Sequence, residues 1–251
     1  NQQPGGYEIP VAMLLGNFTP PSDELPSLVS HSELNTLFHE FGHIAASMAF
    51  SGKYAMQNGS LPDFAEAMSQ LFENWIWDYD ILKTFATHYD TGEVLPEETF
   101  NNMLAAKTLI SGISAQGSVR NSMYDMELYD RYDPDNPVPT DQIWRNLAGK
   151  FAYSGYIDGT HPQAAWIHIN THPTYYYGYL WSRVYAQDMF TQFEANGLLD
   201  TDTGKRYLRL VLANGTQRPI LDVVEEFLGR APNNEAYIRS LGLEAAEAPV
   251  N

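Results

Sequence analysis

The sequence predicts a mainly α-helical fold that forms a single domain over residues 1–251. Apolar residues recur at spacings of three and four along several long segments, which is the period of an amphipathic helix. The chain has 251 residues and 44% hydrophobic content, enough to bury one large core, and no internal repeat is visible. Glycines also follow several of these segments, where a helix C-terminus favours a left-handed residue. They are Gly197, Gly215, Gly229 and Gly242.

The first elements expected along the chain are a flexible end and one strand. Residues 1–10 open in a polar stretch rich in Gly and Pro, which we expect to be flexible. Residues 11–18 form a short apolar run that stops before a Thr-Pro-Pro sequence, and they are the best strand candidate.

Residues 130–139 are rich in Asp and Pro and are predicted to form a loop. Helices are predicted for the remaining periodic segments, at residues 32–50, 63–78, 96–110, 118–129, 141–151, 175–195, 203–213, 219–228 and 233–241.

The first predicted helix, residues 32–50, has a marked start and a broad apolar face. Ser30, followed three residues later by Glu33, has the pattern of a capping box. A buried helix holds its side chains in fixed rotamers, as a metal site requires. The apolar residues at helical spacing are Leu34, Leu37, Phe38, Phe41, Ile44, Ala45 and Met48.

This helix carries HEFGH at residues 39–43, an instance of the H-E-x-x-H pattern. Residues four apart lie on the same face of a helix, so His39 and His43 can both bind one metal ion. Glu40, one position further on, remains available as a general base toward a water molecule. The pattern is typical of zinc peptidases, with the two histidines as ligands of one Zn²⁺.

A catalytic zinc site needs a third protein ligand, and the second predicted helix offers two candidates. Glu66 and Glu73 lie seven residues apart, two turns along one side of a strongly apolar segment. A buried carboxylate needs a cation or a hydrogen-bond donor as its partner. We favour Glu66 as the ligand, with Glu73 as the alternative. Glu73, Gln70 and Ser69 are then candidates for orienting the ligand histidines.

The charge balance and the absence of cysteine exclude several classes of function. The net charge is −17, from 31 acidic and 14 basic residues, so no basic patch is expected that could bind nucleic acid or an anionic membrane. No segment approaches the roughly 18 uninterrupted apolar residues of a membrane span. With no cysteine, the chain has neither disulfides nor a cysteine-based zinc site. We expect a soluble protein, with the cytoplasm favoured over the periplasm.

Four separated segments resemble one known family in the same order. They read LFHEFGH, DFAEAMSQLFENWIWD, YYYGYLWSRVYAQDMF and EEFLGRAPNNEAYIRSLGL. The family is that of the thimet oligopeptidases, which includes neurolysin, oligopeptidase A and dipeptidyl carboxypeptidase. The resemblance implies a zincin-type helical catalytic domain that hydrolyses short peptides with one Zn²⁺ per chain. It also implies that residues 11–18 form an edge strand or small sheet beside the cleft, where Gly16 would hold substrate main chain.

The same resemblance assigns residues to oxyanion stabilisation, for which phenol and imidazole donors serve well. Tyr179 matches the tyrosine that stabilises the tetrahedral intermediate, and Tyr176 matches a companion that contacts substrate. His168 is the preferred counterpart of the family's histidine, with His172 as the alternative and as a further substrate-binding candidate. The family's glycine-rich loop is missing, since residues 169–173 read INTHP. Packing or solvent-facing roles are expected for Tyr175, Tyr177, His31 and His88.

Members of this family are much longer, with a largely helical N-terminal half that forms one wall of a channel. We therefore expect this chain to be the catalytic half, as a fragment, a processed product or one chain of a split enzyme. Two functions stay open beside direct peptide hydrolysis. One is a non-catalytic chain that contains zinc, and the other is a half-enzyme that needs an N-terminal companion chain or domain. Endopeptidase and dipeptidyl carboxypeptidase action both agree with the sequence.

Overall fold

The computed structural model describes residues 2–3, 6–7 and 9–243, and its fold is mainly helical, as predicted. The long helices are α1 (His31–Ala49), α5 (Ser111–Tyr129) and α8 (Tyr177–Asn196). None of the helices in these residues is long and apolar enough to cross a membrane. The shorter helices are α2 (Ala67–Phe72), α3 (Tyr79–Leu82), α4 (Glu97–Lys107), α6 (Thr140–Phe151), α7 (His168–Thr171), α9 (Thr201–Tyr207), α10 (Ile220–Leu228) and α11 (Glu235–Ser240). The short 3-10 helices are η1 (Ala55–Gln57), η2 (Glu73–Trp77) and η3 (Pro162–Ala165). The segment η4 (Leu208–Leu212) is a short π-helix.

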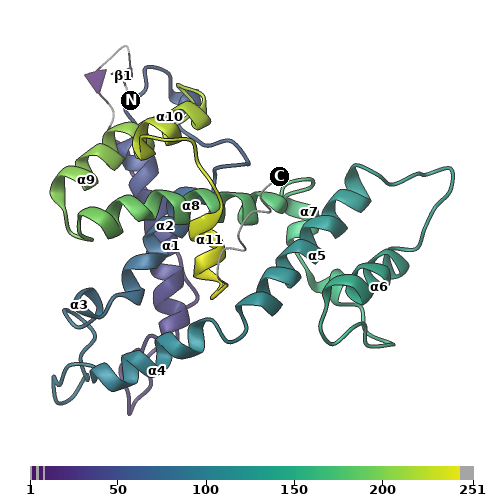
Figure 1. Cartoon of the computed structure of the whole chain (residues 1–251), viewed down its shortest axis with the longest axis horizontal. Coiled ribbons are helices and arrows are strands. Elements are labelled where there is room, and N and C mark those ends of the chain that lie inside the picture. Colours follow the sequence, from purple (N-terminus) through teal and green to yellow (C-terminus); the bar gives the residue numbers. More distant parts are fainter. Residues whose placement is uncertain (1, 4–5, 8, 244–251) are drawn as a thin grey trace, which may run out of the picture.

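The larger hydrophobic core joins α1, α2, α8, η4 and α10, which we call the body (Figure 1). Burying each large side chain of this core contributes about 1.5–3 kcal/mol. Two of the predicted glycine stops end body helices, because Gly197 and Gly229 have φ angles of 108° and 73° after α8 and α10. The fully buried side chains of the core include Phe64, Leu71, Met189, Val211, Val223 and Phe227.

Helices α5, α6 and α7 extend from the body as an arm (Figure 1). The arm has a smaller hydrophobic core of its own, built around Tyr124, Trp144, Leu147, Ala148 and Ile169. The predicted loop at residues 130–139 is confirmed, and it joins α5 to α6. His168 begins α7 directly before the buried Ile169, so the core of the arm positions this histidine.

The segment predicted as one helix at residues 63–78 is divided into parts. A turn leads into α2, and the 3-10 helix η2 follows α2 directly. The Asn74 side chain donates to two carbonyl oxygens of the preceding turn, at 3.0 and 3.4 Å. Such a side chain competes with the backbone hydrogen bonds of a continuing α-helix. Asp78 then caps α3, which the sequence did not predict, by accepting from the Ile81 N–H at 3.0 Å.

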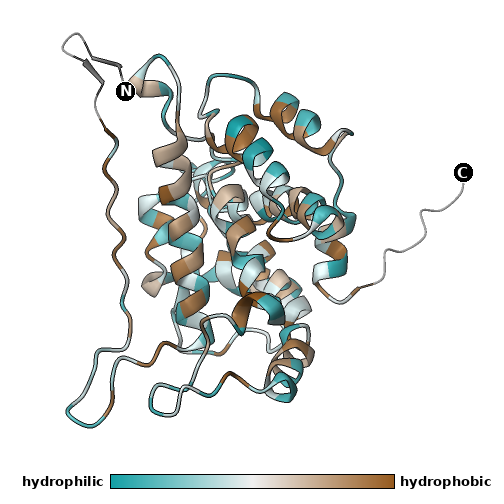
Figure 2. Cartoon of the chain, turned by 90° about the vertical axis from the view of Figure 1, so that its left-hand side faces the viewer, coloured by the Kyte–Doolittle hydropathy of each residue, from teal (hydrophilic) through white to brown (hydrophobic). Residues whose placement is uncertain are grey.

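The strand predicted at residues 11–18 is wrong. The segment runs extended and apart from the helices (Figure 2), and Val11, Met13 and Leu15 are 92%, 79% and 79% exposed. A strand needs a neighbour to satisfy its backbone groups, and none pairs with this segment within the part of the chain that the structure describes. The two-residue strands β1 (Gln2–Gln3) and β2 (Gly6–Tyr7) pair with each other instead. The expected flexibility of residues 1–10 falls partly on residues 1, 4–5 and 8, which lie outside the described residues.

Candidate metal centre

Helix α1 presents the HEFGH motif because the predicted capping box fixes its start. Ser30 Oγ accepts from the Glu33 N–H at 3.2 Å, and Glu33 Oε2 accepts from the Ser30 N–H at 2.7 Å. Hydrogen bonds from Ser30 and then from Thr19 lower the pKa of Glu33 to about 2, so this carboxylate stays ionised at the helix N-terminus. His39 and His43 then follow on one side of α1, and both are half-buried.

Gly42 allows α1 and α2 to approach each other closely. A Cβ atom at this position would lie 2.5 Å from Ser69 Cα and 2.9 Å from the Met68 carbonyl oxygen. Side chains do not make contacts this short with a backbone, so only glycine fits here without a shift. The close approach brings Glu66, at the N-terminal end of α2, to the histidines of α1.

The side chains of His39, His43 and Glu66 converge. Nε2 of His39 lies 3.1 Å from Glu66 Oε2, and Nε2 of His43 lies 3.2 Å from the same oxygen. One ligand atom from each residue lies within 4.8 Å of the other two. Ser69 Oγ also donates to Glu66 Oε2, at 3.1 Å. Burial would raise the pKa of Glu66, but the two histidines outweigh it and hold the pKa below its ordinary value.

Glu73 orients His39 from the other side of the ring. Its Oε1 lies 2.7 Å from His39 Nδ1, which leaves Nε2 facing Glu66. Burial would lower the pKa of His39, yet Glu66 and Glu73 outweigh burial and raise the pKa to about 9. Arg183 of α8, which the sequence analysis missed, donates Nη2 to Glu73 Oε2 at 3.1 Å. A carboxylate in this position fixes the tautomer and orientation of a ligand histidine.

This set of donors fits a divalent metal ion. Two imidazole nitrogens and one carboxylate oxygen are the kind of ligands that Zn²⁺ takes in three-ligand sites. The two candidates for the third ligand occupy different places, because Glu66 faces both histidines whereas Glu73 contacts only His39 among them. Glu40 follows His39 on α1 and is half-buried. It therefore stands beside the metal cluster without belonging to the converging set.

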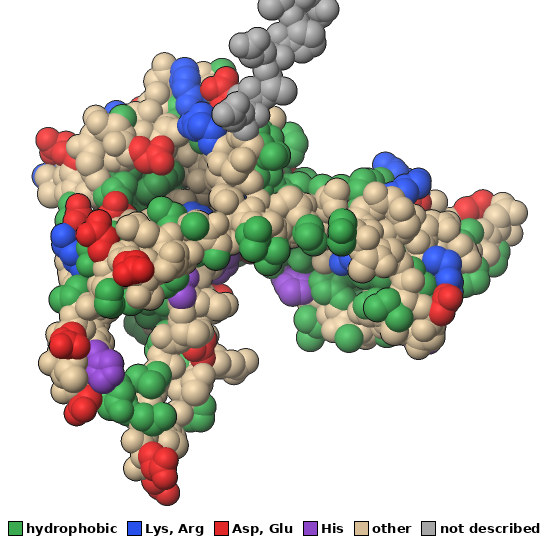
Figure 3. Space-filling model, turned by 60° about the horizontal axis from the view of Figure 1, so that its bottom comes forward, with side chains coloured by type: hydrophobic (Ala, Val, Ile, Leu, Met, Phe, Trp, Pro, Cys, Tyr) green, Lys and Arg blue, Asp and Glu red, His purple; other side chains and the backbone are tan. Residues whose placement is uncertain are grey.

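His168, Tyr176 and Tyr179 lie together across from the ligands. The ring centroids of His168 and Tyr179 are 5.8 Å apart, and those of Tyr176 and Tyr179 are 5.0 Å apart. Burial and then the charge of Glu66 raise the pKa of Tyr179 to about 12, so its hydroxyl stays protonated at neutral pH. Burial and then His172 lower the pKa of His168, which keeps that ring neutral. Histidine side chains gather on both sides of a hollow between the body and the arm (Figure 3).

The other predicted site residues occupy separate positions. Gln70 Nε2 donates to the Tyr179 carbonyl oxygen at 3.0 Å and so ties α2 to α8. Ring centroids place His172 5.9 Å from His168, on the side of Tyr175. Gly16 lines a surface hollow with Glu33 and Thr36, near the start of α1, and it lies in no strand.

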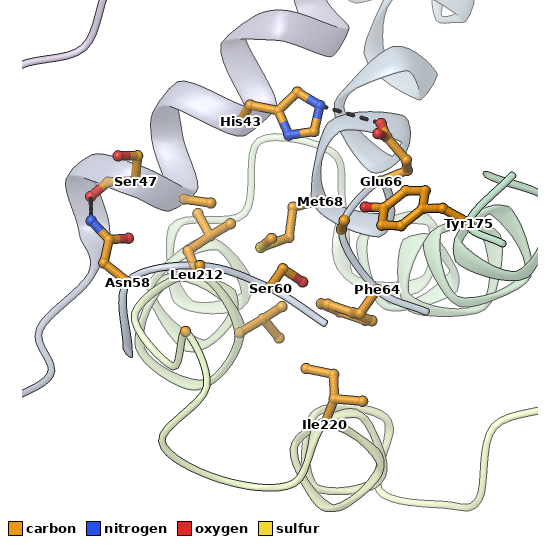
Figure 4. A pocket seen from close by; sticks show the side chains of 15 residues that line it. His43, Ser47, Asn58, Ser60, Phe64, Glu66, Met68, Tyr175, Leu212 and Ile220 are labelled. Atoms are coloured by element: carbon orange, nitrogen blue, oxygen red, sulfur yellow. Dashed lines mark hydrogen bonds and ion pairs between the residues drawn. The ribbon is translucent and has the colours of Figure 1, made fainter. Parts of the chain in front are cut away.

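Tyr175 lies in the site, although the sequence favoured a packing role for it. It lines a cavity of about 350 Å³ together with His43 and Glu66, and its ring stands beside Glu66 (Figure 4). Burial and then the Glu66 charge raise the pKa of Tyr175. Arg183 follows Tyr179 by four residues on α8, and this helical spacing is the signal in the sequence that could have identified Arg183. Tyr175 precedes α8, so no helical spacing identifies it.

Asp125 of α5 holds the segment that leads into the tyrosines. Its carboxylate is 1% exposed and accepts from the N–H groups of Thr174 at 2.9 Å and Tyr176 at 3.0 Å. Thr174 has a φ of 60°, a left-handed conformation that is uncommon for residues other than glycine. Hydrogen bonds to a carboxylate are stronger than those between neutral groups, so they stabilise this turn. No local pattern predicts the contact, because Asp125 and Thr174 are 49 residues apart.

The packed helices carry a His-His-Glu cluster that could hold a metal ion, with tyrosines nearby, and so define a helical protein with a candidate metal centre. Comparison with known proteins gives the family. The sequence model of Peptidase family M3 matches residues 1–243. Thimet-like oligopeptidase of Dictyostelium discoideum is 34% identical over 244 residues, covering 95% of this chain and 36% of the relative. Oligopeptidase A of Escherichia coli (strain K12) is 33% identical over 248 residues, covering 96% of this chain and 36% of the relative.

This chain belongs to peptidase family M3, and its resemblance to the thimet oligopeptidases is confirmed. A solved structure of PZ peptidase A with an inhibitor shares the fold, with a TM-score of 0.62 and 17% identity. That match covers 84% of this chain and 36% of the other. The chain thus spans about a third of the length of the curated relatives it matches.

Replacing Gly42 with alanine is expected to destabilise the protein and to weaken metal binding. The added methyl group overlaps the backbone of α2, and overpacking of this kind typically costs about 1–3 kcal/mol. Gly117→Ala is the matched control, because a Cβ atom at this position of α5 meets nothing within 4 Å and alanine favours a helix by about 0.5–1 kcal/mol. Denaturant unfolding and zinc titration measure both effects. Unchanged stability and zinc affinity in Gly42→Ala would show that the helices are free to separate.

Proposed function

We propose that this chain is the zinc-binding catalytic part of an oligopeptidase that hydrolyses peptide bonds in short peptides. The observation that carries the proposal is the convergence of His39, His43 and Glu66, with Glu40 beside them on α1. Membership in a peptidase family and the names of its oligopeptidase relatives support it. A non-catalytic zinc-binding chain is less favoured, because peptide hydrolysis uses a carboxylate and a phenol near the metal, such as Glu40 and the half-buried Tyr179, whereas zinc binding alone does not.

When bound, Zn²⁺ would supply Lewis acidity, polarising the peptide carbonyl and lowering the pKa of a water molecule to about 7. Glu40 would take the proton of that water as the oxygen attacks the carbonyl carbon, and would then pass it to the leaving amine. Tyr179 would donate a hydrogen bond to the carbonyl oxygen as negative charge develops there. One such donor is worth roughly 2.7–4 kcal/mol in other hydrolases. His168 would add a second donor, and Tyr176 would contact the substrate.

The substrates in this proposal are short peptides, bound in the hollow between the body and the arm. A companion chain or domain would form the opposite wall of the channel. This part of the proposal is supported by the length of the relatives, of which this chain spans 36%.

Cleavage of a quenched fluorescent short peptide by the purified chain tests the proposed function. We expect turnover that a chelator abolishes and that one equivalent of Zn²⁺ restores. Turnover that starts only after an N-terminal companion is added would assign the chain to a half-enzyme. Absence of turnover under both conditions, in a chain that holds zinc, would contradict the proposal.

Tyr179→Phe is expected to lower kcat and kcat/KM by similar factors and to change KM little. The substrate carbonyl does not yet carry the charge that the hydroxyl stabilises, so the lost interaction belongs to the transition state. A loss of roughly 100-fold corresponds to removal of one oxyanion donor. Tyr177→Phe is the control, because its hydroxyl bonds to Asp63 and not to the ligand cluster. A raised KM with unchanged kcat would instead assign Tyr179 to ground-state binding.

The two histidines near Tyr179 are compared in the same assay. His168→Ala is expected to reduce turnover more than His172→Ala, because the ring of His168 lies against both Tyr176 and Tyr179. A larger loss of turnover in His172→Ala than in His168→Ala would assign oxyanion stabilisation to His172 instead.

A further inference from the structure

The metal ligands and the tyrosines of the candidate site are held by different parts of the fold. His39, His43 and Glu66 lie on α1 and at the start of α2, and both helices belong to the body. The tyrosines lie at the start of α8, shortly after α7 of the arm (Figure 1). Residues 169–176 join these two helices, and we call them the tyrosine loop. The placement of the tyrosines therefore depends on how the arm holds this loop.

Helix α5 of the arm binds the tyrosine loop at both ends. At the first end, the Tyr129 hydroxyl donates to the Ile169 carbonyl oxygen at 2.6 Å. At the other end, Asp125 Oδ1 accepts from the Thr174 N–H at 2.9 Å, and Asp125 Oδ2 accepts from the Tyr176 N–H at 3.0 Å. Asp125 and Tyr129 are four residues apart, so they lie on one face of α5. We call these three hydrogen bonds the α5 clamp.

The carboxylate of Asp125 is spent on the backbone of the loop. It is 1% exposed, and each of its two oxygens accepts one of the loop N–H groups. Burial of a carboxylate is unfavourable unless donors compensate for the lost water, and the resulting hydrogen bonds are strong because the acceptor is charged. Tyr176 is also the residue at which α8 starts, where a helix has unpaired N–H groups and favours a negative charge. Asp125 thus stabilises the first turn of α8 from outside that helix.

Thr174 shows that the α5 clamp acts against a local backbone preference. Its φ of 60° is left-handed, and this conformation is unfavourable for a residue that has a Cβ atom. The hydrogen bond from the Thr174 N–H to Asp125 opposes a return to negative φ. Such a return would change the direction in which the chain enters α8.

The rings that follow the α5 clamp are those assigned to the substrate in the proposed function. The ring of Tyr176 lies 4.6 Å from that of Trp166 and 5.0 Å from that of Tyr179, measured between centroids. Tyr179 lies about one turn after Tyr176 on α8, so a shift at the start of the helix moves both rings together. The metal ligands follow other segments of the chain and make no hydrogen bond with Asp125 in the described residues.

We propose that Asp125 is a positioning residue of the peptidase, with Tyr129 as the second anchor of the clamp. Its carboxylate fixes the backbone at Thr174 and Tyr176 so that Tyr176 and Tyr179 stay across from the metal ligands. Zinc binding then depends on the body, whereas the placement of the oxyanion donor depends on the arm. This inference rests on the proposed function for the role of the tyrosines. The clamp itself can be tested without turnover.

Hydrogen exchange of single amides, followed by NMR in the zinc-loaded protein, tests the α5 clamp. The amides of Thr174 and Tyr176 are expected to exchange slowly in the parent and about tenfold faster in Asp125→Asn, because the substitution removes the charged acceptor. Zinc affinity and the exchange of α1 amides are expected to stay unchanged. The control is Glu127→Gln on the same helix, whose carboxylate contacts Arg131 at 2.9 Å. Fast exchange in the parent, or unchanged exchange in Asp125→Asn, would overturn the clamp.

Peptide cleavage then tests the positioning role. Asp125→Asn is expected to lower kcat by about 10- to 100-fold, since a displacement of about 1 Å in catalytic groups can have an effect of this size. The same substitution in a Tyr179→Phe protein is expected to cost clearly less, because the hydroxyl that the clamp positions is already gone. Equal losses in the two backgrounds would overturn the positioning role, and so would unchanged kcat in Asp125→Asn.

Tyr129→Phe tests the other end of the clamp and keeps the test decisive where Asp125→Asn does not fold. It removes one neutral hydrogen bond at a residue that is 46% exposed, so kcat is expected to fall by about two- to tenfold with zinc affinity unchanged. A lowered zinc affinity with unchanged kcat would contradict the separation of the two parts. A loop that loosens in Asp125→Asn at unchanged zinc affinity, in a protein that shows no turnover, would uphold the clamp while contradicting the proposed function.

Discussion

Replacing Glu40 with glutamine is expected to remove nearly all peptidase turnover while zinc and fold are kept. The amide has the same shape as the carboxylate but cannot accept a proton, and general-base catalysis contributes roughly 10² to 10⁴-fold to a rate. Glu40 lies outside the set of converging ligand atoms, so the metal content should stay at one zinc per chain. Peptide cleavage and metal analysis of the same preparation measure both quantities.

The control for this substitution is Glu225→Gln, an exposed glutamate of α10 that should retain full activity. Loss of zinc in Glu40→Gln would show that Glu40 holds the metal centre together. Full activity would remove it from the mechanism.

Glu66→Gln should weaken zinc binding more than Glu73→Gln does. Glu66 Oε2 lies 3.1 and 3.2 Å from the Nε2 atoms of both histidines, so its loss removes one of three ligand atoms. Glu73 contacts only the Nδ1 of His39 within that set, and removal of such an outer partner typically costs about 10 to 100-fold in affinity. Competition against a chromophoric chelator gives both dissociation constants.

The order of the two effects decides which carboxylate is the ligand. Equal losses of zinc affinity in the two variants would indicate that both carboxylates bind the metal. A loss of affinity confined to Glu73→Gln would make Glu73 the ligand and Glu66 the outer partner. Circular dichroism spectra of the zinc-free variants are compared with that of the zinc-free parent protein. Unchanged spectra would show that a loss of zinc affinity comes from the missing ligand and not from unfolding.

The parts of the site that the sequence predicted are those fixed by local geometry. The capping box at Ser30 sets where α1 begins, and the helical repeat then places His39 and His43 on one face. The position of Glu66 could not be predicted from local geometry alone. Its carboxylate reaches the histidines only because Gly42, which has no side chain, allows α2 to approach α1 closely. That glycine stands inside the motif itself, so the sequence carried the information for this helix contact.

The failures of prediction have physical causes that lie outside the local sequence. Residues 11–18 have the composition of a strand, but strand formation depends on a partner that the described chain does not place there. The break after α2 depends on one side chain, Asn74, whose hydrogen bonds to the preceding turn are invisible in a hydrophobic pattern. Arg183 and Asp125 act through partners 110 and 49 residues away. Tertiary packing alone brings these pairs together.

The distances along the chain between partners also bear on the order in which the centre assembles during folding. His39 and Glu73 close a loop of 34 residues, whereas Arg183 meets Glu73 across 110. The entropy of loop closure makes the longer contact less favourable by about 1 kcal/mol. Loop closure alone therefore favours the contact between His39 and Glu73 over the contact between Glu73 and Arg183 of α8. Chain connectivity alone would then place metal capture ahead of catalytic competence in refolding.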